Sequence, residues 1–236
     1  MEGYVHSFES LAAVDGIGLR YAVFMQGCPL RCIYFHNPDT WEITKINPVS
    51  PDVLADKISR YKTYFGKDGG AVFSGGEPLL QAEFVYETGC CLREYGINYV
   101  VDTSGAVRLT DCVKKALSNA ELVILDYKFP DDELYRKYTG VGIENTLKIL
   151  DYLEDIDKKT WLRTVVVPGI NDTKEKISRY LPLIKSKKCV ERYELLPFHT
   201  MGFFKYEELG IENALQNTKA LNRDVLDSLR DFACDI

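Results

Sequence analysis

The stretch Tyr21–Trp41, YAVFMQGCPLRCIYFHNPDTW, decides the fold and the interpretation of this chain of 236 residues. Its first part, Tyr21–Gln26, is almost entirely apolar and predicts a buried β-strand. Cys28 and Cys32 follow in the next loop with three residues between them. Thiolates are the usual ligands of iron–sulfur clusters, so such a pair is a candidate for holding one inorganic centre. Taken alone the pair is weak evidence, because cysteines also serve as small buried apolar residues.

Five further segments of strand length follow, and each is succeeded by a segment of helical period. The expected strands are Ala71–Ser74, Tyr99–Asp102, Leu122–Asp126, Trp161–Val167 and Arg192–Leu196. Helices are expected after Pro51, over Leu80–Tyr95 and Thr110–Ser118, in a longer region ending near Asp155, over Thr173–Lys185 and from Asn217 onward. This alternation is typical of βαβ units and a parallel sheet. Six units form either an open doubly wound sheet or an incomplete barrel. No linker rich in Gly, Pro or Ser divides residues 1–236, so we expect a single domain.

Composition narrows the class of protein. The hydrophobic fraction of 46% and the charged fraction of 27% are ordinary for a globular protein, and the net charge of -6 argues against a nucleic-acid surface. No segment approaches the roughly 18 apolar residues of a membrane span, and the N-terminus lacks the features of a signal peptide. We therefore expect a cytoplasmic protein that binds neither nucleic acid nor membrane. In that compartment the cysteines outside the loop are predicted to be buried thiols: Cys90, Cys91, Cys112, Cys189 and Cys234.

Polar and glycine residues gather where the other predicted strands end. They are Gly75, Gly76 and Glu77, then Asp102 and Thr103, then Asp126 and Lys128, then Arg163 within its strand, and finally His199. Because the carboxyl ends of parallel strands meet on one face, we expect these residues to converge. Burying such groups is costly unless they pair or hold a ligand. The set suits a small zwitterionic ligand, with carboxylates for an ammonium or a cation and Lys128 or His199 for a carboxylate or ribose. A structural network of ion pairs is the alternative.

The ordered motifs of the chain resemble those of the pyruvate formate-lyase activating enzymes, a family of the radical S-adenosylmethionine (SAM) superfamily. The motifs are YVHSFES, VDG, GCPLRC, HNPDTW, FSGGEPLLQAEF, VDTSG, LDYK, RTVVVPGINDT and ELLPFH, and together they span nearly the whole chain. The resemblance implies an α/β fold, an incomplete (β/α)6 TIM-like barrel of the radical SAM type. It also implies an activase that generates a glycyl radical on a protein substrate of the pyruvate formate-lyase type.

The same resemblance implies the cofactors and partners. In the family, three cysteines of a Cys-x3-Cys-x2-Cys motif bind a 4Fe–4S cluster, and SAM binds its open iron. Reductive cleavage of SAM then yields a 5′-deoxyadenosyl radical, which removes a hydrogen atom from a glycine of the partner. An electron donor such as flavodoxin or ferredoxin is implied, and we expect a monomer.

Individual roles are likewise implied by the resemblance. Cys28 and Cys32 match the first two cluster ligands, and together with Lys128 and Arg163 they are the expected catalytic residues. The remaining matches surround SAM: the turn for its amino group at Gly75, Gly76 and Glu77, a monovalent-cation site at Asp102, Thr103 and Asp126, and further contacts at Tyr34, Lys128 and His199.

Position 35 departs from the family pattern. Phe35 stands where the third cluster ligand is expected, and its ring has no lone pair for iron. His36 is a poor substitute, since the family has a histidine there beside its cysteine. Three interpretations follow: an activating enzyme with an altered ligand, a pseudoenzyme that binds SAM or docks on a glycyl-radical protein, and a non-radical SAM- or nucleotide-binding enzyme. The presence of the other site residues favours the first.

Overall fold

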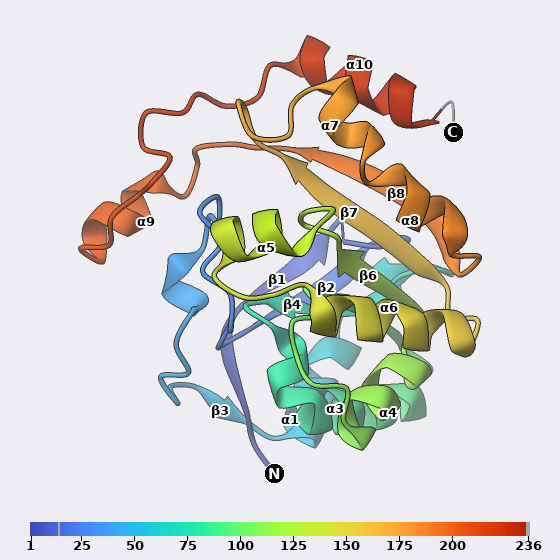
Figure 1. Ribbon diagram of the computed structural model, residues 1–236. Coiled ribbons are helices and arrows are strands. Elements are labelled where there is room, and N and C mark those ends of the chain that lie inside the picture. The colour runs from blue at the N-terminus through green and yellow to red at the C-terminus, as the bar shows by residue number, and fades with distance from the viewer. Residues whose placement is uncertain (14, 235–236) are drawn as a thin grey trace.

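A single curved sheet of eight strands forms the centre of the computed structural model, which describes residues 1–13 and 15–234 (Figure 1). The strands are β1 Gly3–Ala12, β2 Arg20–Met25, β3 Pro48–Val49, β4 Gly70–Gly75, β5 Asn98–Thr103, β6 Leu122–Asp126, β7 Thr160–Val166 and β8 Val190–Pro197. Val14, within the VDG motif, and the side chain of Cys234 lie outside the described part of the chain.

The parallel strands follow one another across the sheet in chain order, β2-β4-β5-β6-β7-β8. A doubly wound sheet would reverse direction at a switch point, whereas here each strand is added on the same side. Among the described residues β8 pairs only with β7, so the sheet does not close. The predicted incomplete barrel of six βα units is therefore confirmed, and the doubly wound alternative is wrong.

Two strands were not predicted. β1 pairs antiparallel with β2, and the two-residue β3 pairs antiparallel with β1, so the segment expected as the first strand is the second. β1 carries a mixture of polar and apolar residues because it lies outside the parallel set, where only three of its ten residues are buried. Such a strand gives no continuous apolar run in the sequence.

The α-helices are α1 Pro51–Ser59, α2 Lys62–Phe65, α3 Ala82–Glu94, α4 Asp111–Asn119, α5 Asp132–Thr139, α6 Glu144–Asp155, α7 Lys174–Ser178, α8 Leu181–Ser186, α9 Phe203–Glu208 and α10 Arg223–Cys234, and the 3-10 helices are η1 Pro38–Thr40 and η2 Pro78–Gln81. Two expected helices are divided, one by left-handed Gly140 after α5 and one by Pro182 at the start of α8. The last helix begins at Arg223 and not near Asn217, because Asn222 accepts the backbone N–H of Asp224 and starts it there. None of the described helices is both long and apolar enough to span a bilayer.

The strands separate two cores because successive side chains point to opposite faces. On β2, Tyr21, Val23 and Met25 pack in the larger core, which includes buried side chains of α1 and α3. The alternate residues face the inside of the barrel, where neighbouring strands form an apolar layer: Ala22, Val72, Val100 and Leu122. Inward-facing residues nearer the carboxyl ends lie above this layer, and they form the site.

Candidate functional site

A cavity of about 520 Å³ opens at the carboxyl ends of the parallel strands. Its size is in the range of small-molecule sites. The predicted site residues that line it are Cys28, Cys32, Tyr34, Gly75, Gly76, Asp102, Thr103, Asp126, Lys128, Arg163 and His199. Phe35, which stands where the sequence resemblance implies a third cysteine, lines it as well. Residues from six strand ends and their loops thus meet as the parallel topology requires.

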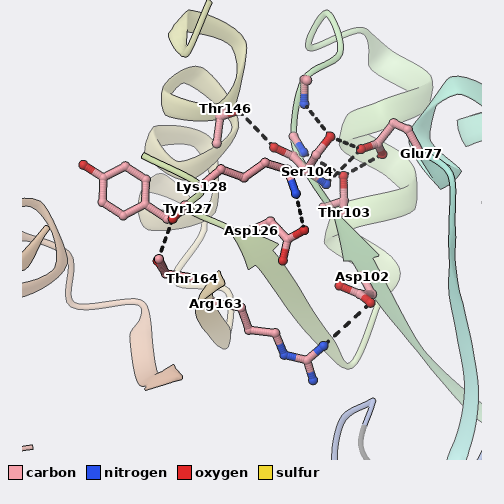
Figure 2. Close-up of polar contacts among 12 residues, drawn as sticks. Glu77, Asp102, Thr103, Ser104, Asp126, Tyr127, Lys128, Thr146, Arg163 and Thr164 are labelled. Carbon is pink, nitrogen blue, oxygen red and sulfur yellow. Dashed lines mark hydrogen bonds and ion pairs between the residues drawn. The ribbon is translucent and has the colours of Figure 1, made fainter. Parts of the chain in front are cut away.

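Arg163 lies at the centre of an ion-pair network inside the barrel (Figure 2). Its Nε donates to Glu194 Oε2 at 2.9 Å, and its Nη1 lies 3.7 Å from Asp102 Oδ2 and 3.7 Å from Asp15 Oδ1. Burial lowers the pKa of Arg163, but Asp102, Glu194 and further carboxylates outweigh it and hold that pKa above its usual value. Asp15 was not predicted as a site residue, because it precedes β2 in a loop whose position only the structure gives.

The side chain of Asp102 is 16% exposed and accepts a hydrogen bond from Ser74 Oγ at 2.8 Å. Burial raises the pKa of Asp102 to about 7, although Arg163 opposes that rise. Burial likewise raises the pKa of Asp15. Near neutral pH the network therefore holds carboxyl groups that are costly to ionise, and a bound cation would reduce that cost.

Lys128 and Asp126 form a second ion pair, with 2.7 Å between Nζ and Oδ2 (Figure 2). Burial alone lowers the pKa of Lys128, but Asp126 and other neighbours raise it well above its usual value. The loop that carries Lys128 is fixed by its backbone: Thr164 Oγ1 donates to the carbonyl of Tyr127 at 2.6 Å, and Tyr180 OH to that of Lys128 at 3.2 Å. A charged ammonium is thus held at the cavity wall.

Glu77 is fully buried, and its side chain does not line the cavity. Its carboxylate accepts hydrogen bonds from Thr103 Oγ1 at 2.6 Å, the Ser104 backbone N–H at 2.9 Å, Ser104 Oγ, and the Leu79 N–H at 3.0 Å (Figure 2). These bonds join the turn after β4 to the turn after β5. In this structure Glu77 supports the cavity from behind, while the backbone of Gly75 and Gly76 faces it.

Gly76 is required by close packing. A Cβ at this position would lie 2.2 Å from the carbonyl oxygen of Gly27, at the start of the cysteine loop. The backbone N–H of Glu77 donates to that same carbonyl at 2.7 Å. The glycine turn and the cysteine loop are therefore in direct contact.

Two polar atoms at the cavity have no hydrogen-bond partner within the described chain. They are Tyr34 OH and His199 Nδ1, both buried, and both residues line the cavity. Buried polar groups of native proteins are nearly always hydrogen-bonded. Two buried atoms without a partner at one cavity therefore indicate that a ligand or ordered water binds there.

Replacement of Asp102 by Asn tests the ion-pair network through stability. The folded state holds the Asp102 proton more tightly than the unfolded state does, so this carboxyl group stabilises at low pH and loses that contribution as pH rises through about 7. Asn keeps the bond to Ser74 without the charge. We expect the free energy of unfolding of Asp102→Asn to exceed that of the parent by roughly 1–2 kcal/mol at pH 8 and to differ little from it near pH 4. Urea denaturation at both pH values measures this, and a variant less stable at pH 8 would contradict it.

An open barrel of six βα units with a cysteine pair in the loop after its first parallel strand defines a class, and the chain belongs to the radical SAM superfamily, whose family model matches residues 22–181. Enzymes of this superfamily use a 4Fe–4S cluster and SAM. Within it, the chain belongs to the pyruvate formate-lyase-activating enzymes. It is 40% identical over 231 residues to that enzyme of Clostridium pasteurianum, covering 98% of this chain and 96% of the relative. It is also 40% identical over 226 residues to the enzyme of Staphylococcus epidermidis, covering 93% of this chain and 90% of the relative.

Solved structures agree with the fold. A domain of a pyruvate-formate lyase-activating enzyme from Bacteroides vulgatus superposes with a TM-score of 0.58 at 24% identity, over 71% of this chain and 94% of that one. SuiB of Streptococcus suis bound to S-adenosylmethionine has a TM-score of 0.68 at 16% identity, over 89% of this chain and 45% of its own. At these identities the likeness concerns the fold alone.

The donor set of this chain does not fit a cluster held by three thiolates. Cys28, Cys32 and Phe35 line the cavity together, so the position of the third ligand is occupied by a ring without a donor atom. The other cysteines whose side chains are described, Cys90, Cys91, Cys112 and Cys189, do not line it. In residues 1–13 and 15–234, no three His, Cys, Asp or Glu side chains are arranged to hold a metal ion.

Proposed function

We propose that this chain has the architecture of a SAM-dependent activating enzyme whose substrate is a glycyl-radical enzyme of the pyruvate formate-lyase type, with its activity impaired by Phe35 at the third ligand position. The observation that carries the proposal is the single cavity wall on which the strand-end residues meet, in a chain that matches curated activating enzymes over almost its entire length. We further propose that residues 1–236 act as one radical SAM domain and as a monomer in the cytoplasm. The free thiols of the described cysteines are consistent with that reducing compartment.

The residues of this chain suit SAM by charge and shape. Gly75 and Gly76 line the cavity without side chains, so an amino group can approach their backbone there. Lys128 supplies a fixed positive charge for a carboxylate, and the unpaired atoms of Tyr34 and His199 are free to hydrogen-bond polar groups of the ligand. We propose that Asp102, Thr103 and Asp126 hold a monovalent cation beside it, which would offset the negative charge of the two aspartates.

The substrate is proposed to be a protein segment that reaches the cavity from its open side. Arg163 lines this cavity and is paired with three carboxylates, so its guanidinium is fixed before any substrate arrives. Exposed apolar side chains stand beyond β8, among them Met201 and Phe204. A flavodoxin or ferredoxin is the proposed electron donor.

Phe35 raises one alternative to this proposal: a pseudoenzyme that binds SAM or its partner without activating it. An anaerobic incubation with a glycyl-radical enzyme of the pyruvate formate-lyase type, SAM and a reductant separates the two. Electron paramagnetic resonance of the partner reports the glycyl radical, with the native chain and with Phe35→Cys. We expect the radical from Phe35→Cys and at least about 100-fold less from the native chain. A Phe35→Cys protein with a full cluster that leaves the partner without a radical would contradict the proposed function.

A further inference from the structure

We infer that Phe35 alone bars the three-thiolate site in this chain, and that the loop around it is otherwise built for one. The inference rests on the proposed function for its meaning. Its readout is the iron and sulfide content of the isolated protein, which needs neither partner nor activity.

The backbone of the loop is fixed independently of the ring at position 35. At its start, the N–H of Cys28 donates to the carbonyl of Trp41 at 3.0 Å. At position 35 the N–H donates to the Cys32 carbonyl at 3.1 Å, and the Phe35 carbonyl accepts from Tyr206 OH at 2.7 Å. None of these bonds uses the Phe35 side chain, so a change of side chain leaves the three positions in place.

Helix α9, with the turn before it, holds the same loop from the other side. Gly202 approaches His36 so closely that a Cβ would lie 2.0 Å from the His36 carbonyl oxygen. Lys205 Nζ donates to Asn37 Oδ1 at 2.8 Å and pairs with Asp39 Oδ2 at 2.9 Å. These contacts join segments more than 160 residues apart and restrict the loop to one path.

The side chain of Phe35 packs within that fixed backbone. Its ring stacks on Trp41 with 6.4 Å between centroids and 15° between planes, and it lines the cavity with Cys28 and Cys32. A cysteine at position 35 would thus place a third sulfur on the wall that already carries two. It would also lose the stacking contact, so the protein without cluster should melt at a lower temperature, by roughly 3–6 °C.

Phe35→Ser is the matched control, because serine has nearly the size of cysteine and removes the same ring without supplying a thiolate. His36→Ala in the native background tests whether the neighbouring imidazole already serves as the third ligand. Four proteins, namely the native chain, Phe35→Cys, Phe35→Ser and His36→Ala, are purified anaerobically and incubated with iron and sulfide. Iron and sulfide content, the reduced 4Fe–4S resonance and the melting temperature before and after loading are then measured.

We expect about four iron and four sulfide ions per chain in Phe35→Cys, with a melting temperature above its unloaded value. The native chain and Phe35→Ser should both stay below about one iron per chain. Full loading of the native chain would overturn the inference, and its loss in His36→Ala would then identify His36 as the ligand. A Phe35→Cys protein that folds and remains unloaded would overturn it equally, since position 35 would not be the only bar. Failure of the proposed function would instead appear as a loaded Phe35→Cys that leaves the partner unactivated.

Discussion

Replacement of Arg163 by methionine is expected to lower the free energy of unfolding by about 3–5 kcal/mol at pH 8. The change removes the cation that faces Asp102, Asp15 and Glu194, while the methionine retains most of the buried volume. Glu194 keeps an ion pair with Arg192 at 2.7 Å, so the loss falls mainly on the other two carboxyl groups. Urea denaturation of the variant and the parent measures the difference.

The pH dependence identifies the cause of that loss. Arg163 lowers the pKa of both Asp102 and Asp15, so its removal raises both values further. Carboxyl groups that are protonated in the folded state do not need the arginine, and the destabilisation should therefore shrink as pH falls from 8 to about 5. Asp102→Asn added to Arg163→Met should recover part of the loss at pH 8, which a double-mutant cycle quantifies. An equal loss at pH 5 and pH 8 would attribute the effect to packing and not to charge.

Replacement of Glu77 by alanine is expected to cost about 3–4 kcal/mol and to weaken SAM binding by at least about tenfold. The change leaves the hydroxyl groups of Thr103 and Ser104 and two backbone N–H groups without their acceptor inside the protein. Because these bonds hold the turn that faces the cavity, stability and affinity should fall together. Denaturation and isothermal titration calorimetry with SAM measure the two.

Glu77→Gln is the matched control. It keeps one acceptor oxygen but places an amide NH2 against donors on one side, so we expect less than half of the alanine effect on both quantities. A Glu77→Ala protein with unchanged stability and lost SAM affinity would show that Glu77 contacts the ligand directly in the bound state, and the supporting role derived from this structure would be wrong.

The sequence by itself determined the six parallel strands and most of the cavity wall. Strand-length apolar runs alternating with helical segments define βα units, and parallel strands present their carboxyl ends on one face. Asp102, Asp126 and Arg163 were found in this way, because their positions follow from the strand they occupy and from the period of two along it. The family and the departure at Phe35 were also readable from the order of the motifs.

Only the tertiary structure decided which of these groups touch. Asp15 joins Arg163 through a loop of no regular period, and Glu77 turns from the cavity toward Thr103 because that is where its donors lie. Tyr206 reaches the Phe35 carbonyl across 171 residues of sequence. Local pattern encodes which face a side chain takes within its own element. Contacts between loops depend on how the elements pack, and that packing is settled by the whole core at once.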